Sequence, residues 1–489
     1  MKLFRNLGLL MLGMTIFLSL TLVFPLSPNY SQSPLSTDNC FKILAQADEL
    51  FLAGQKEDAK ALYRECKPDF PAQSAVAEIP EPVYKIEELG GGQRFWSQAQ
   101  DGMQRNLDSK IYFNLVPLIQ NYPQFVPAYE MLAKFCQKEA EFCEKSAKEG
   151  QPKNAVEVLE QATETFPDDT VLLRAKIDLM VESEQFLEAS IAARQFTLVY
   201  SDSPEASEFE KLADKYLAAF KNNINEKLIG QTVVSVLVGA GGAILNNDPY
   251  QGLSGLQTVA MLLKGEKGFG AEVAGLYSNQ YQGNGQLVDD PEVLKYVQGL
   301  AGRLTPYMGR NFDYEYYVVK DNNLNAFALP GGKIFVNTGA ILKTQSEAEL
   351  AGLLAHEISH AALSHGFQKV AQANLLGNFE QIIPVINRLS ALVNAQFSQY
   401  SERQADILGT RVLALSGYSA DGMRNLMVAI KKESGDRKTS YLDSHPAPGD
   451  RVQYLEKMIQ DYKYNRYGYE GVKSHKAIQD RLLGSVPAS

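Results

Sequence analysis

The segment HEISH, residues 356 to 360, contains residue types that can bind a metal ion and activate water. On a helix, His356 and His360 would lie on one face, one turn apart, so both imidazoles can bind the same ion. Glu357 would lie beside the metal and can take a proton from a zinc-activated water. We therefore predict one zinc ion per chain, held by His356 and His360, with Glu357 as the general base. The alternative is a helix whose two histidines are merely buried and hydrogen-bonded.

A catalytic zinc site usually has a third protein ligand. The pattern HExxHxxGxxH would supply another histidine, but Leu363 and Gly366 occupy its glycine and histidine positions. His365 would be about half a turn out of phase on a continuing helix, so we expect it to be structural. Glu402 in the segment SERQAD is the better candidate, with Asp406 one turn later as a hydrogen-bond partner for a ligand imidazole. The alternative for SERQAD is a solvated charged face.

The proline-rich segment SHPAPGDR, residues 444 to 451, contains two further candidates for the site. His445 would lie in a rigid loop from which it can enter a cleft and take part in catalysis. Arg451 would begin the last long helix, where it could stabilise an oxyanion or hold the loop through ion pairs. A plain surface loop is the alternative for both residues.

The segments NAFALPGGKIFVNTG, HEISH, SERQAD and SHPAPGDR, in this order and spacing, resemble metallopeptidase family 48. This gluzincin family includes the HtpX-, LoiP-, BepA- and Oma-like zinc endopeptidases, and the resemblance covers residues 268 to 464. It implies that His356, His360 and Glu402 bind zinc and that Asp406 lies behind the ligands. It also implies that His445 lies close to zinc, where it either aids catalysis or closes the resting site as a fourth ligand.

The same resemblance implies that an edge strand beside the metal pairs with an extended substrate. This substrate edge strand would consist of Lys333, Ile334, Phe335 and Val336. Family members in bacterial envelopes degrade misfolded or stalled membrane and outer-membrane proteins, and some carry a tetratricopeptide domain after the protease. In this chain the helical half comes first, which departs from that layout.

The elements that must position these residues are mainly helical. Residues 38–223 have apolar residues at helical spacing, and the turns that begin at Phe166 and Tyr200 are 34 residues apart, the period of tetratricopeptide helix pairs. A non-repeating helical bundle is the alternative. Residues 268–465 alternate between helices and short strands, and Ser346 with Glu349 forms a capping box before HEISH. We therefore expect a mainly α protein: an all-α, tetratricopeptide-like domain followed by an α+β gluzincin metallopeptidase domain with a small sheet.

Three apolar segments and the end of the chain complete the predicted organisation. Residues 1–36 predict a signal peptide or a retained membrane anchor, whose apolar part, residues 7–26, is long enough to span a bilayer. Within residues 224–267 the glycine-rich stretch Leu228–Leu245 is expected to be a buried connector, with a membrane-touching hairpin as the alternative. Leu375–Val393 is expected to pack against the core, although it could also cover the cleft or touch lipid. Residues 466–489 are expected to be a C-terminal tail.

Charge and cysteine content restrict the function further. A net charge of −10 without any basic tract argues against a nucleic-acid-binding surface. An even number of cysteines behind an export segment favours disulfides, and Cys40 with Cys66 is a plausible pair. Cys136 and Cys143 need an intervening turn, because seven residues along one helix separate the thiols too far. Free buried thiols are the alternative for both pairs.

Together these features predict an exported zinc metalloendopeptidase of the bacterial periplasm or cell envelope. Its expected substrates are unfolded or misassembled envelope and membrane proteins, and its helical half would recruit them or other envelope assembly partners. The alternative is a chaperone-like or tetratricopeptide binding module in which His445 permanently closes the zinc site.

Overall fold

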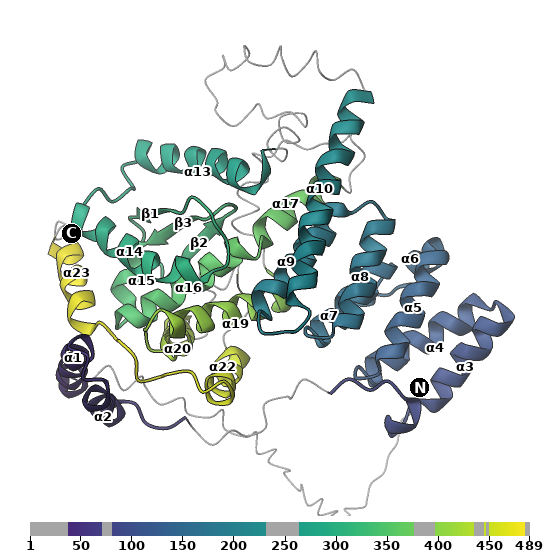
Figure 1. The fold of residues 1–489 in the computed structure, drawn as a ribbon, viewed down its shortest axis with the longest axis horizontal. Helices are drawn as coiled ribbons and strands as arrows, with labels where there is room; N and C mark the ends of the chain where they lie inside the picture. The colour runs from purple at the N-terminus through teal and green to yellow at the C-terminus, as the bar shows by residue number, and fades with distance from the viewer. Residues whose placement is uncertain are drawn as a thin grey trace, which may run out of the picture. The chain divides into compact units, whose positions relative to one another are not determined.

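The computed structural model of the chain describes residues 38–70, 81–230, 264–375, 397–434, 445 and 449–484. The described residues all belong to one compact unit, which is mostly helical (Figure 1). The predicted export segment, most of the glycine-rich stretch and nearly all of Leu375–Val393 lie outside the described residues. In the part of the chain that is described, no helix has both the length and the apolar character needed to cross a membrane.

The amino-terminal half consists of helices. The first two pack on each other, and those from residue 93 onward pack on one another along the chain. Asp169 caps one of them by accepting hydrogen bonds from the backbone N–H groups of Val171 and Leu172, which agrees with the turn predicted there. The helices are α1 (Asp38–Leu52), α2 (Lys56–Cys66), α3 (Gln93–Arg105), α4 (Asp108–Asn121), α5 (Val126–Lys138), α6 (Ala140–Ser146), α7 (Ala155–Thr165), α8 (Thr170–Glu182), α9 (Phe186–Val199) and α10 (Ala206–Gly230), with a short 3-10 turn at Ile86–Glu88. The all-helical prediction is therefore confirmed for this half.

The carboxy-terminal half is a mixed α and β structure, so the predicted fold class is confirmed. Its first elements are α13 (Gly265–Gly283), α14 (Pro291–Leu304), a 3-10 turn at Thr305–Tyr307, β1 (Glu315–Val319), β2 (Ala326–Leu329), β3 (Lys333–Asn337) and α15 (Thr338–Lys343). The helices that follow are α16 (Glu347–Ala362), α17 (His365–Leu375), α19 (Gln399–Leu415), α20 (Gly422–Ser434), α22 (Gly449–Asp461) and α23 (Val472–Gly484). The segment that we expected to be a C-terminal tail thus contains a helix.

The sheet has three strands in the order β1-β3-β2 and lies between α13 and α16 (Figure 1). β2 and β3 form an antiparallel hairpin, and β1 pairs with β3 in parallel. The prediction that Lys333–Val336 is an edge strand is therefore wrong, because β3 is paired on both sides. The hairpin pattern could not reveal that a strand upstream in the chain occupies the far side of β3. Among the described strands, β1 and β2 form the edges.

Helix α16, which carries HEISH, runs through the centre of this half, and every residue of it is buried. Two glycines allow its neighbours to approach the helix backbone. A Cβ atom on Gly352 would lie 2.9 Å from the Met423 nitrogen of α20, and one on Gly409 of α19 would lie 3.2 Å from the His356 nitrogen. Backbones at this separation bring side chains of α19 directly against the histidine face of α16.

Helices α1 and α2 pack against the far end of the chain. Asp48 accepts hydrogen bonds from the backbone N–H groups of Glu470 and Val472, at 2.9 and 3.0 Å. The buried Lys67 forms ion pairs with Asp421 and Glu470. These contacts join the beginning of the described chain to its last helices.

Both cysteine pairs considered from the sequence form disulfides, so the alternative of free thiols is wrong. Cys40–Cys66 joins α1 to α2, and Cys136–Cys143 joins α5 to α6. The second bond is feasible because the helix breaks at Glu139, which is the turn that the sequence required.

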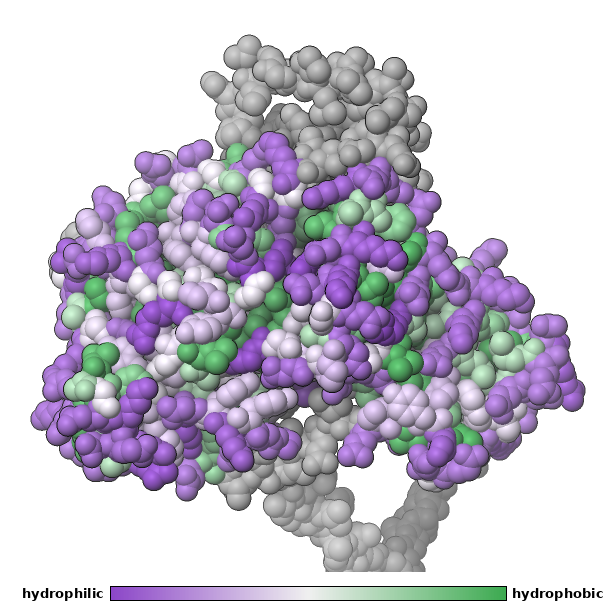
Figure 2. Space-filling model, viewed as in Figure 1, coloured by the Kyte–Doolittle hydropathy of each residue, from purple (hydrophilic) through white to green (hydrophobic). Residues whose placement is uncertain are grey.

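Hydrogen bonds at α9 join the amino-terminal half to the carboxy-terminal half. The side-chain amide of Gln195 donates to the Leu363 carbonyl at 2.9 Å, just after α16. Arg411 of α19 donates to the carbonyls of Leu198 and Val199 at the end of α9. On the face shown in Figure 2, hydrophilic residues cover most of the surface and hydrophobic residues appear in small patches.

Candidate metal centre

The two histidines of HEISH lie on one face of α16, as their spacing predicts. Ser346 accepts from the Glu349 N–H and the Glu349 carboxylate accepts from the Gln345 N–H, so a capping box fixes the start of this helix. The Nε2 atoms of His356 and His360 lie 3.1 Å apart. Both imidazoles therefore present the same nitrogen to a common point.

Glu402 of α19 and His445 complete a cluster of four donors around this point. Oε1 of Glu402 lies 3.3 Å from His360 Nε2 and 2.7 Å from His445 Nδ1. One ligand atom from each of His356, His360, Glu402 and His445 lies within 4.8 Å of every other, and all four residues are buried. Two helices and the proline-rich loop thus bring together residues that are up to 89 positions apart in the chain.

His356 is oriented by a carboxylate behind the cluster. Its Nδ1 lies 2.9 Å from Asp406 Oδ1, which leaves Nε2 directed at the other donors. Arg451 donates to both oxygens of Asp406, at 2.8 and 2.7 Å, and to Glu402 at 2.8 Å. Tyr454, one turn later on α22, also donates to Asp406. Of the two roles considered for Arg451, the structure favours ion pairing, since the guanidinium is committed to these carboxylates.

His360 is oriented by a different partner, His365, whose Nδ1 lies 2.8 Å from His360 Nδ1. Ser364 adopts a left-handed conformation with φ 60°, which ends α16 and lets α17 begin in a new direction. His365 therefore returns toward α16, whereas a continuing helix would have placed it out of phase. Sequence reasoning missed this contact, as well as the hydrogen bond from His365 to Gln404 and the contribution of Tyr454.

The acidic groups of the site differ in the direction in which their pKa values are shifted: two are lowered and one is raised. Burial opposes ionisation of Glu402, but the charges of His445 and Arg451 outweigh it and hold the pKa of Glu402 well below its usual value. Arg451 and His356 lower the pKa of Asp406 in the same way against burial. Burial raises the pKa of Glu357, which lies 3.5 Å from His445 Nε2. A raised pKa suits a carboxylate that must accept and then return a proton.

The donor set fits a zinc ion. Zinc in proteins is bound by imidazole nitrogens and carboxylate oxygens, usually with four donors, and the cluster offers three imidazoles and one carboxylate. Glu357 supports the same assignment, because its buried Oε1 has no hydrogen-bond partner among the described residues although it faces the cluster. Water bound near the cluster would satisfy this oxygen.

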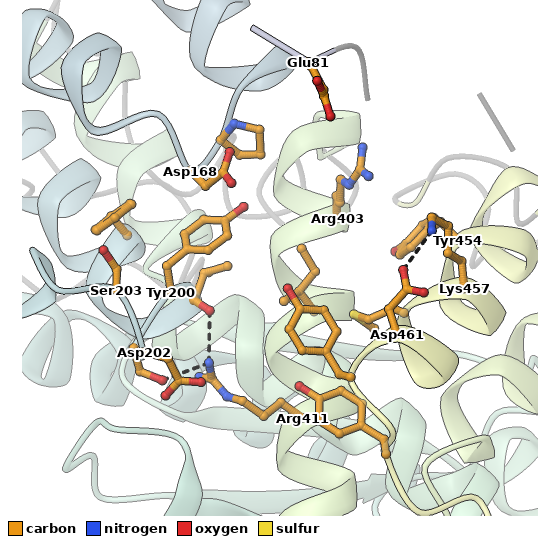
Figure 3. A pocket seen from close by; sticks show the side chains of 18 residues that line it. Glu81, Asp168, Tyr200, Asp202, Ser203, Arg403, Arg411, Tyr454, Lys457 and Asp461 are labelled. Atoms are coloured by element: carbon orange, nitrogen blue, oxygen red, sulfur yellow. Dashed lines mark hydrogen bonds and ion pairs between the residues drawn. The ribbon is translucent and has the colours of Figure 1, made fainter. Parts of the chain in front are cut away.

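A pocket of about 720 Å³ lies beside α19 (Figure 3). Arg403 and Arg411 of α19 line it, together with Tyr200 after α9 and Tyr454 of α22. Tyr454 therefore contacts both the pocket and Asp406. Arg403 lies over the Tyr454 ring, 5.4 Å from its centroid.

Residues 289–459 match the model of peptidase family M48. A putative beta-barrel assembly-enhancing protease of Vibrio cholerae is 26% identical over 245 residues, which is 45% of this chain and 50% of that protein. The mitochondrial metalloendopeptidase OMA1 of Arabidopsis thaliana is 32% identical over 174 residues, 33% of this chain and 36% of that protein. Metalloprotease LoiP of Escherichia coli is 32% identical over 161 residues, 30% of this chain and 62% of that protein.

The chain spans about half or less of the length of the beta-barrel assembly-enhancing proteases and of OMA1. The matched segment contains all four donors of the cluster as well as Glu357, Asp406 and Arg451. The buried donor set thus lies within the segment that matches the family. The part of the chain from residue 289 to residue 459 is a domain of peptidase family M48.

Proposed function

We propose that this chain is a zinc-dependent metalloendopeptidase in which His356, His360 and Glu402 hold the metal and Glu357 is the general base. The observation that carries this proposal is the convergence of buried donors from two helices on one point, with the partly satisfied Glu357 carboxylate beside it. Asp406 would fix the orientation of His356, and Arg451 would hold both carboxylates in place.

Zinc in such a site supplies Lewis acidity, which lowers the pKa of water and polarises a peptide carbonyl. Glu357 would take a proton from the attacking water at Oε1 and pass it to the departing amine as the C–N bond breaks. Its burial supports this exchange, since a raised pKa makes the carboxylate a better proton acceptor and an adequate donor afterwards.

His445 would control access to the site. Its Nδ1 lies 3.4 Å from His356 Nε2 and 2.7 Å from Glu402 Oε1, so the imidazole takes the position of a fourth donor. A fourth protein donor leaves no open position, whereas catalytic zinc sites keep one. We infer that His445 withdraws when substrate binds.

The substrate would be an extended polypeptide segment. β2 (Ala326–Leu329) is an edge of the sheet among the described strands and packs against α16, so it replaces Lys333–Val336 as the strand that pairs with substrate. The relatives named as beta-barrel assembly-enhancing proteases support unfolded or misassembled envelope proteins as substrates in the bacterial periplasm. The helical half, with its predicted tetratricopeptide-like repeats, would recruit these proteins or their assembly partners.

The test is cleavage of an unstructured protein such as casein by the full chain loaded with zinc. Glu357→Gln should abolish cleavage while zinc stays bound, because the amide keeps the shape of the side chain but accepts no proton. Cleavage at the wild-type rate by this variant would contradict the proposal. Zinc content, measured on the same samples, separates loss of the base from loss of the metal.

A second candidate function is favoured by the four-donor arrangement itself. If His445 closed the site permanently, the chain would be a binding or chaperone-like module with a structural metal. His445→Ala should raise cleavage of casein if the histidine is a gate. Absence of cleavage in both the wild type and His445→Ala would favour the binding module.

A further inference from the structure

A chain of four side chains extends from the metal cluster into the helices around it. His360 Nδ1 lies 2.8 Å from His365 Nδ1, and His365 Nε2 lies 3.1 Å from Gln404 Oε1. The amide nitrogen of Gln404 donates to the Tyr400 hydroxyl oxygen at 3.0 Å. His360, His365 and Gln404 are all buried, so water cannot substitute freely for any of these contacts.

The direction of each hydrogen bond follows from the orientation of the Gln404 amide. Because the Gln404 NH₂ group donates to Tyr400, its carbonyl oxygen faces His365 and can only accept. His365 must therefore carry its proton on Nε2. A neutral imidazole has one N–H, so its Nδ1 accepts a hydrogen bond from Nδ1–H of His360. His360 then keeps a lone pair on Nε2, the nitrogen that faces the other donors.

We propose that His365 is a positioning residue that, held by Gln404 and Tyr400, fixes the tautomer and ring orientation of His360 for metal binding. This inference rests on the proposed zinc site. Asp406 fixes the orientation of His356. A carboxylate therefore orients His356, whereas an imidazole orients His360. Among the described residues, His365 is outside the cluster of donors that can reach a metal, and it acts only through His360.

The ring of His360 is also restrained from its face. Phe397 stacks on it with 4.0 Å between the ring centroids and an interplanar angle of 23°. The stacking fixes the plane of the imidazole, but a 180° flip of the ring about the Cβ–Cγ bond would still exchange Nδ1 with Cδ2 and Nε2 with Cε1. The hydrogen bond to His365 opposes this flip, and so gives the pair a function that packing alone does not supply.

Two variants of the full chain separate positioning from packing. His365→Leu fills much of the space but accepts no hydrogen bond, and zinc affinity should fall about 10- to 100-fold. His365→Asn places a carbonyl oxygen near the position of Nδ1 and should retain zinc affinity within a few-fold of wild type. Phe367→Leu is the matched control, because Phe367 is buried on the same helix and packs on Phe269 instead of His360.

Zinc affinity is measured by competition with a chromophoric chelator, and the His360 tautomer by ¹⁵N NMR, which is practicable because the chain has five histidines. In the metal-free protein His360 should be protonated on Nδ1 in the wild type and in His365→Asn, and should lose this preference in His365→Leu. Equal zinc affinity in His365→Leu and wild type, or an equal loss in both variants, would overturn the proposal. The NMR result tests the hydrogen bond even if the wild type binds no zinc, an outcome that would instead refute the proposed function.

Discussion

Arg451 is a buried cation that binds two carboxylates at the metal centre. Its guanidinium donates to Asp406 through Nε and Nη2 and to Glu402 through Nη1. Both carboxylates remain charged because of this cation and the neighbouring imidazoles, which lower their pKa values against the effect of burial. The positions of the Glu402 and Asp406 carboxylates thus depend on one side chain.

We predict that Arg451→Leu lowers the free energy of unfolding of the metal-free protein by about 3–5 kcal/mol, because it leaves buried carboxylates without their cation. Chemical denaturation measures this loss. Arg174→Leu is the matched control: Arg174 also binds a carboxylate through two nitrogens, but its partner Glu208 is 60% exposed, so the loss should stay within about 1 kcal/mol. Similar losses for the two variants would show that Arg451 contributes no more than a surface ion pair.

The residues of the site differ in how far the sequence could predict them. His356 and His360 follow from helix geometry alone, since a spacing of four brings them to one face. The partners of Arg451 depend on how α22 packs against α19, so the sequence left its role open. The contact of His365 depends on the left-handed conformation of Ser364, and spacing along an ideal helix predicts the opposite outcome.

At the level of elements, Gly352 allows α20 to approach α16, the helix that carries the two histidines, very closely. A Cβ atom on Gly352 would lie 2.9 and 3.0 Å from the backbone N and Cα atoms of Met423, which cannot move as freely as a side chain. We predict that Gly352→Ala destabilises the protein by about 1–3 kcal/mol through overpacking, and weakens zinc binding by shifting α16. Thermal unfolding and chelator competition measure the two effects.

Gly299 of α14 provides the control for this substitution. A Cβ atom there would meet nothing within 4 Å, so Gly299→Ala should stabilise the helix by about 0.5–1 kcal/mol. The two variants introduce the same methyl group into helices and should change stability in opposite directions. A gain in stability for Gly352→Ala would show that α20 can move away from α16 without cost.

The sheet shows why element order is harder to predict than element type. The strands at 315–319 and 333–337 and the hairpin turn between β2 and β3 follow from local patterns of apolar residues and glycines. The strand order depends on the connection from β1 to β2, which contains no pattern that specifies on which side of β3 each strand lies. The family resemblance implied that Lys333 and its neighbours form an edge, although they lie at the centre of the sheet.

At the scale of the whole molecule, segments from both ends of the described chain pack against the protease core. Lys67 reaches Asp421 and Glu470, and Asp48 holds the backbone at residues 470 and 472. No local pattern predicts contacts across such distances in sequence, and residues 466–489 were expected to be a tail for this reason. The helix α23 in this segment is instead anchored by His475, which is buried against α14 and α15.

His475 should make stability depend on pH. Tyr296 donates to its Nδ1 and its Nε2 donates to the Thr344 carbonyl, so both nitrogens are satisfied in the neutral ring. Burial lowers the pKa of His475 to about 4, whereas an exposed histidine has a pKa of about 6.5. Between these values the unfolded chain binds a proton that the folded chain does not. His475 therefore makes its full contribution to the free energy of unfolding above about pH 6.5. This contribution is lost as the pH falls toward 4, and the loss is roughly 3 kcal/mol at the lower end.

The prediction is tested by comparing wild type with His475→Gln, whose side chain cannot be protonated in this range. Other titrating groups, including His365, remain in both proteins, so their contributions cancel in the difference. Urea denaturation at several pH values between 7.5 and 4.5 should show wild type losing stability faster than the variant as the pH falls. If the stabilities of the two proteins changed in parallel with pH, His475 would have to take up its proton over the same pH range in the folded and unfolded chains, and the prediction would be wrong.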